Sequence, residues 1–265
     1  MRKNLGPSVN LDFLDGYLFR LLQEIAARDG LEQSGFLNYY GYRIANKIGG
    51  LIEYEECLAR YLLAEYSGRR VVHAGMGLGT LACALACNGM TVTGIEAHAN
   101  RVKSARLLRS ALIEIWPEVA DRYHIIQGFY PQVLTGKRAS RLLPWRWIIP
   151  PTPSPDPNAI LVFTNVVTTW SDEAMASIID SMPRFSEVFL DLKLFGTMRE
   201  EDDERAALFD RIAASARSAE RLPELASGSH FARFVFGSAA AAVLAILHAA
   251  ADLMTIADGV LVATL

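Results

Sequence analysis

The sequence of 265 residues is poor in cysteine and has no excess of basic residues. Its three cysteines are too few for a disulfide framework, which favours a reducing compartment such as the cytoplasm. Its 26 lysines and arginines are outnumbered by 29 aspartates and glutamates, which gives a formal net charge of −3. A protein that coats nucleic acid needs a dominant basic surface, so we expect no nucleic-acid partner. Because 51% of the residues are apolar, the chain has ample material for a packed core.

The sequence also lacks a clear targeting or membrane segment. Asp12 and Asp15 interrupt the apolar stretch that would have to follow Arg2 and Lys3 in a signal peptide. The most lipid-like stretch, residues 239–256, owes most of its apolar count to alanine and contains a histidine and an aspartate. We therefore expect no stable membrane insertion. We interpret this stretch as an Ala-rich helix that packs on a neighbour, and a homodimer contact is one way to cover it.

Two segments with helical periodicity precede the rest of the chain. Apolar residues fall on one face of the run that follows Asn10 and of a second run over residues 51–66. A Ser-Gly pair ends the second run. We expect residues 1–68 to form an N-terminal helical cap and residues 69–265 to form the main, nucleoside-binding domain.

From residue 69 onward, short β-rich runs alternate with helical ones. Strands are expected over residues 71–73, 91–96, 123–127, 159–164 and 187–193, with helices over 80–87, 100–115 and 172–181. This alternation implies a parallel sheet with helices on both faces, and right-handed crossovers make it a doubly wound α/β fold.

The C-terminal part of the chain follows a less regular pattern. We expect a helix over residues 200–220, a strand over 230–236, a helix over 238–253 and a final strand over 259–263. Five of the eleven prolines fall within residues 150–157, which predicts an extended loop. A basic and aromatic cluster precedes that loop and consists of Arg138, Arg141, Trp145, Arg146 and Trp147. We interpret the cluster as a solvated loop whose tryptophans pack back on the domain, with an anionic partner as the alternative.

Three glycines at alternate positions, Gly75, Gly77 and Gly79, join the first expected strand to a helix. Glycine lets the chain turn sharply there and lets a ligand touch bare backbone. Glu96 ends the next strand, so in a doubly wound sheet its carboxylate lies at the same carboxyl edge. It can there accept hydrogen bonds from both ribose hydroxyls of an adenosine. The combination predicts a nucleoside site.

The spacing of the glycines distinguishes two classes of cofactor. Dinucleotide sites favour G-x-G-x-x-G, whereas this loop reads G-x-G-x-G and has Thr80 at the position of the third glycine. Residues 69–193 resemble the class I S-adenosylmethionine-dependent methyltransferases, whose first motif is an acid, one spacer and G-x-G-x-G, and whose second is an acid that ends the second strand. The resemblance implies S-adenosyl-L-methionine as cofactor. It also implies that the three glycines line its methionine and ribose part and that Glu96 holds the ribose.

Three positions depart from the pattern of that family. His73 stands where the family has the acid before the loop, so the hold on the cofactor's amino group is weakened or replaced; a satisfied polar residue at a strand end is the alternative. Gly128-Phe129 replace the usual Gly-Asp after the third strand, which leaves stacking or backbone contacts for adenine. Asn165 ends the fourth strand, where the family keeps residues near the reacting methyl group, although it can also be a turn residue. It is followed by Val-Val-Thr, unlike the signature of enzymes that methylate amino groups of bases or glutamine.

The resemblance therefore implies methyl transfer to a small-molecule nucleophile, with no catalytic residue identified. Three alternatives stay open: transfer of the aminocarboxypropyl arm of the same cofactor, as in nicotianamine-type synthases; a nicotinamide oxidoreductase, which Thr80 disfavours; and a non-catalytic nucleotide-binding or interaction domain. Cys83 and Cys87 have a spacing that can bind a metal but lack further ligands, so we expect no metal site. The expected cofactor-binding residues are His73, Gly75, Gly77, Gly79, Glu96, Gly128, Phe129 and Asn165.

Overall fold

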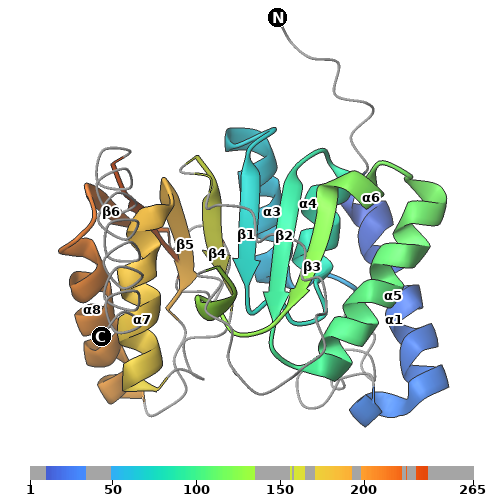
Figure 1. The fold of residues 1–265 in the computed structure, drawn as a ribbon, viewed down its shortest axis with the longest axis horizontal. Helices are drawn as coiled ribbons and strands as arrows, with labels where there is room; N and C mark the ends of the chain where they lie inside the picture. Colours follow the sequence, from blue (N-terminus) through green and yellow to red (C-terminus); the bar gives the residue numbers. More distant parts are fainter. Residues whose placement is uncertain are drawn as a thin grey trace, which may run out of the picture.

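A mixed seven-stranded sheet forms the centre of the computed structural model, in the order β3-β2-β1-β4-β5-β7-β6 (Figure 1). The structure describes residues 10–33, 49–134, 156, 158–164, 171–192, 198–222, 225 and 231–237. The strands are β1 (Arg70–Ala74), β2 (Thr91–Glu96), β3 (Tyr123–Gln127), β4 (Ile160–Phe163), β5 (Glu187–Asp191), β6 (Ser218–Arg221) and β7 (Phe231–Val235). β1 to β5 are parallel, and β7 is antiparallel to both β5 and β6. The predicted doubly wound, mostly parallel sheet is confirmed.

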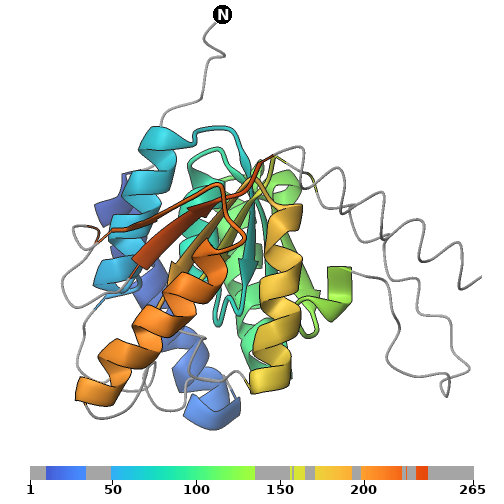
Figure 2. The ribbon, with the colours of Figure 1, turned by 90° about the vertical axis from the view of Figure 1, so that its left-hand side faces the viewer.

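Helices cover both faces of this sheet (Figures 1 and 2). One face carries α1 (Leu11–Gln33), α3 (Glu53–Glu65), α4 (Thr80–Cys87), α5 (Ala99–Ile115) and the short α6 (Val119–Arg122). The other carries α7 (Asp172–Ser181) and α8 (Met198–Ala213). Two short 3₁₀ turns, Gln132–Leu134 and Met182–Arg184, follow β3 and α7. No described helix is both long enough and apolar enough to cross a membrane.

Each face of the sheet has its own hydrophobic core. Leucines of α1 and α3 are buried in the same core as those of α4, so the N-terminal helices share the packing of the glycine-loop helix. Val71 of β1 belongs to this core, whereas Ala74 belongs to the core beneath α7 and α8. Because successive side chains of a strand point to opposite faces, His73 points to the same face as Val71, toward α3 and α4.

The structure corrects the helix predicted over residues 200–220. α8 ends at Ala213, and Ser218–Arg221 form β6, which pairs antiparallel with β7. β6 is an edge strand of mostly exposed polar side chains, so it carries no apolar alternation that would separate it from the preceding helix. The predicted strand over 230–236 is confirmed as β7.

Several predicted features of the chain lie outside the described residues. They are the helix over 238–253 within the Ala-rich stretch, the strand over 259–263, the basic and aromatic cluster, most of the proline-rich segment, and Asn165.

Candidate functional site

The glycine loop lies at the carboxyl end of β1, directly before α4. Gly75, Gly77 and Gly79 have φ angles of 69°, 60° and 77°, a region that residues with a Cβ rarely adopt. At Gly79 a Cβ would also collide with the hydroxyl group of Tyr123. The backbone therefore requires glycine at these positions, which explains the spacing seen in the sequence.

Most N–H groups of this loop already donate hydrogen bonds within the protein. The N–H groups of Gly75 and Met76 donate to the carbonyl oxygen of Ile95, at 2.8 and 3.0 Å. Gly77 donates to the Glu96 carboxylate at 2.9 Å, and Gly79 donates to the carbonyl oxygen of Met76 at 2.9 Å. A loop that cradles a phosphate directs such groups at the ligand instead. This loop is consequently poorly suited to a phosphate group.

Glu96 connects three parts of the carboxyl edge of the sheet. Its side chain is buried, with Oε2 accepting from the Gly77 N–H and Oε1 accepting from the His98 N–H, both at 2.9 Å. Its carbonyl oxygen accepts from Gly128 N–H at 3.0 Å. An ionised carboxylate has about four lone-pair sites, so two remain for other donors. The glycine loop and the start of α5 thus both donate to the Glu96 carboxylate, and the segment after β3 is held by the backbone of the same residue.

His73 is completely buried at the end of β1. Its Nε2 lies 2.8 Å from the hydroxyl oxygen of Thr164, which directly follows β4. Its Nδ1 has no hydrogen-bond partner among the residues that the structure describes. Burial lowers the pKa of the imidazole to about 3, so the ring is neutral at pH 7. A neutral ring with one unused nitrogen can form a hydrogen bond to a polar ligand group, but it cannot form an ion pair with an ammonium group.

The segment after β3 presents an aromatic ring at the same edge. Gly128 has a φ of 155°, and a Cβ there would collide with Val133. Phe129 follows and is 71% exposed, an unusual degree for a large apolar side chain. The next residue, Tyr130, is anchored through its hydroxyl group, 2.7 Å from that of Ser181. The ring of Phe129 is therefore accessible beside an anchored backbone.

Sequence reasoning missed Glu55 of α3, a buried carboxylate at the same edge. Both of its carboxylate oxygens lie 2.9 Å from the hydroxyl oxygen of Thr80, the first residue of α4. Oε2 also accepts from the Ile52 N–H at 3.0 Å, so Glu55, the third helical residue, reaches back to cap the start of α3. Glu55 stands among other acids in the first turn of α3, so nothing in the sequence distinguishes it from Glu53 and Glu56.

Met76 and Tyr123, which the sequence analysis did not single out, hold the glycine loop against the sheet. The hydroxyl oxygen of Tyr123 lies 3.3 Å from the sulfur of Met76, and both side chains are buried. Gly94 of β2 leaves the space that Met76 occupies, since a Cβ there would overlap the Met76 sulfur. The glycine loop is thus packed tightly against β2 and β3.

The structure brings five of the predicted site residues together. Glu96 accepts hydrogen bonds from Gly77 and Gly128, and Gly75 and Gly79 lie in the same loop as Gly77. His73 lies two residues before that loop, and Phe129 directly follows Gly128. In the described part of the chain, no group of three or more His, Cys, Asp or Glu side chains is arranged to hold a metal ion.

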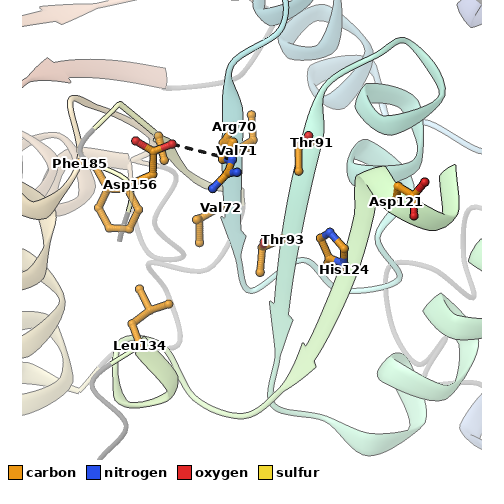
Figure 3. Close-up of a pocket in the computed structure, with 11 residues that line it drawn as sticks. Arg70, Val71, Val72, Thr91, Thr93, Asp121, His124, Leu134, Asp156 and Phe185 are labelled. Atoms are coloured by element: carbon orange, nitrogen blue, oxygen red, sulfur yellow. Dashed lines mark ion pairs between the residues drawn. The ribbon is translucent and has the colours of Figure 1, made fainter. Parts of the chain in front are cut away.

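A cavity of about 330 Å³ lies away from these residues (Figure 3). Its walls include Arg70 and Thr91, the first residues of β1 and β2, so it reaches the opposite end of the sheet. Val72 and Thr93 also line it, and Arg70 forms an ion pair of 3.8 Å with Asp156 at its rim. None of the predicted site residues lines it.

Comparisons with known proteins return methyltransferases among solved structures. The methyltransferase domain of bacterial CtHen1-C is 15% identical, covers 70% of this chain and 97% of its own, and gives a TM-score of 0.46. Precorrin-6y C5,15-methyltransferase from Geobacter metallireducens GS-15 is 12% identical, covers 68% of this chain and 86% of its own, and gives a TM-score of 0.40. No family model and no curated protein matches the sequence.

Proposed function

We propose that the chain is an S-adenosyl-L-methionine-dependent transferase that moves a methyl group to a small-molecule nucleophile. The observation that carries the proposal is the buried Glu96 carboxylate beside a glycine loop most of whose N–H groups donate within the protein. A ribose needs an acceptor for its two hydroxyls, which Glu96 supplies, whereas a pyrophosphate needs free N–H donors. The site therefore suits a nucleoside without phosphate better than a nicotinamide dinucleotide.

The features of the edge fit the parts of this cofactor. Glu96 would accept hydrogen bonds from the ribose hydroxyls, and the exposed ring of Phe129 would stack on adenine. The buried Nδ1 of His73, which has no partner among the described residues, would hydrogen-bond to a polar group at the amino-acid end. Gly75, Gly77 and Gly79 would line the methionine and ribose part, and Asn165 remains a predicted contact near the methyl group.

The bound cofactor would supply a methyl group on a positively charged sulfur. The chain would contribute orientation and exclusion of water, which are the main requirements of such a displacement. His73 does not meet the needs of a general base at neutral pH, because burial lowers its pKa to about 3. We therefore assign no general base.

Titration calorimetry with S-adenosylhomocysteine tests this proposal on wild type and on Glu96→Gln. Glutamine keeps one acceptor oxygen but loses the charge and half of the acceptor sites, so we expect affinity to fall about tenfold or more. Glu118→Gln serves as the control, because Glu118 is an exposed residue directly before α6. This variant should bind S-adenosylhomocysteine as tightly as wild type does. Equal affinity of wild type and Glu96→Gln would contradict the assignment of the ribose site.

Product analysis separates methyl transfer from aminocarboxypropyl transfer once an acceptor is found. Methyl transfer leaves S-adenosylhomocysteine, whereas transfer of the aminocarboxypropyl arm leaves methylthioadenosine. Binding without either product over a panel of acceptors would favour the interaction-domain alternative.

A further inference from the structure

A carboxylate of the protein itself lies beside the first residue of α4. In glycine-loop folds this end of the helix is where anions bind, because the helix dipole and free N–H groups point there. Here Glu55 reaches over from α3, and both of its carboxylate oxygens lie 2.9 Å from the Thr80 hydroxyl oxygen. The Glu55 side chain is only 2% exposed. An anionic ligand group at this helix end would have to displace or approach a buried acid.

A second buried carboxylate lies on the other side of the loop. Glu96 is bound to the N–H of Gly77 in the middle of the loop, whereas Glu55 is bound to Thr80 at its end. The loop is thus flanked by two acids, and its N–H groups at Gly75, Met76, Gly77 and Gly79 already have acceptors. Repulsion by buried charges is stronger than repulsion across water, because the local dielectric is lower. The surroundings of the loop oppose negative charge on a ligand and favour neutral or positive charge.

We infer that Glu55 is a specificity-determining residue, which excludes nucleotides that carry a 5′-phosphate and admits nucleosides whose 5′ substituent is neutral or cationic. The inference rests on the proposed function, since it places the ribose at Glu96 and therefore the 5′ substituent next to the glycine loop. It assigns to Glu55 a repulsive role in ligand choice, in addition to its capping of α3.

A purely structural role for Glu55 makes a different prediction. The bond from Thr80 links α3 to α4, and the bond from the Ile52 N–H caps α3. A purely structural change would therefore weaken the binding of every nucleoside alike. A role in selectivity changes the ratio of affinities for charged and uncharged ligands. The ratio is therefore the quantity to measure.

The experiment compares 5′-methylthioadenosine with adenosine 5′-monophosphate, which share base and sugar, by calorimetry. The variants are Glu55→Gln and, as a control, Glu53→Gln, which removes the same charge from an exposed position in the first turn of α3. In Glu55→Gln we expect the monophosphate to gain about tenfold or more in affinity relative to the thioether. In Glu53→Gln the ratio should stay within about twofold of wild type.

An unchanged ratio in Glu55→Gln would overturn the inference while leaving the proposed function standing. Absence of thioether and S-adenosylhomocysteine binding to wild type would overturn both.

Discussion

Replacing Glu187 with glutamine tests what holds the sheet together at the end opposite the glycine loop. Glu187 begins β5, and its buried carboxylate accepts from the Tyr66 hydroxyl at 2.6 Å, from Arg69 Nη1 at 2.6 Å and from Arg233 Nε at 2.7 Å. It thereby connects the loop after α3, β5 and β7. Burial by itself would raise the pKa of Glu187, but the hydrogen bonds from Tyr66, Arg69 and Arg233 lower it below its usual value.

The magnitude of the effect follows from this burial. Removing one partner of a buried ion pair costs about 3 to 5 kcal/mol, because the remaining charges are left uncompensated. The side chains of Arg69 and Arg233 are 29% and 27% exposed, so solvent relieves part of that cost. We therefore expect Glu187→Gln to lower the free energy of unfolding by about 2 to 3 kcal/mol, which lowers the melting temperature by about 4 to 12 °C.

Thermal and urea unfolding, followed by circular dichroism, measure this change. Glu220→Gln is the matched control: Glu220 binds the same Arg233 at 2.8 Å, but its side chain is 51% exposed, so the loss should stay below about 1 kcal/mol. Because the folded pKa of Glu187 is lowered, its contribution is present above the unfolded pKa of about 4.3 and is lost as the pH falls through the folded pKa. The difference from Glu187→Gln should shrink in that acidic range. A loss of stability no larger than that of Glu220→Gln would show that the buried Glu187 carboxylate does not hold this end of the sheet.

Two further predictions concern the site. Phe129→Ala should weaken the binding of S-adenosylhomocysteine about tenfold in calorimetry, since stacking of a base on an aromatic ring contributes about 1 to 3 kcal/mol. The melting temperature should stay unchanged because the ring is exposed. Unchanged affinity would contradict the stacking role. His73 has a pKa of about 3 when folded and about 6.5 when unfolded, so the unfolded state binds more protons between these values and wild type should lose stability as the pH falls from 6.5. His73→Gln should lose less over the same range in urea unfolding, and parallel curves would contradict a buried neutral imidazole.

The sequence was sufficient to predict those features that depend on local patterns. Alternating β-rich and helical runs predicted the parallel part of the sheet, and the spacing of the glycines predicted the turn that the backbone requires. The position of Glu96 at the end of β2 followed from the same rhythm, because parallel strands end at one edge. Its hydrogen bond to Gly77 is the physical result of that placement.

Features that depend on contacts between distant segments were not predictable. Glu55 is separated from Thr80 by 25 residues, and nothing in the first turn of α3 shows that one of its acids is buried against α4. Thr164 likewise meets His73 only because β4 pairs with β1. β6 was missed because an exposed edge strand of polar residues lacks the apolar alternation by which strands are recognised.

A crystal structure of the chain with S-adenosylhomocysteine is the most direct test of the proposed ribose site at Glu96. We predict both ribose hydroxyls within hydrogen-bonding distance of the Glu96 carboxylate, with adenine stacked on Phe129 and the sulfur over the glycine loop. A nucleoside bound elsewhere, for example in the cavity beside Arg70 and Asp156, would contradict it. So would a crystal grown with saturating ligand in which the carboxyl edge of β1 and β2 holds no nucleoside.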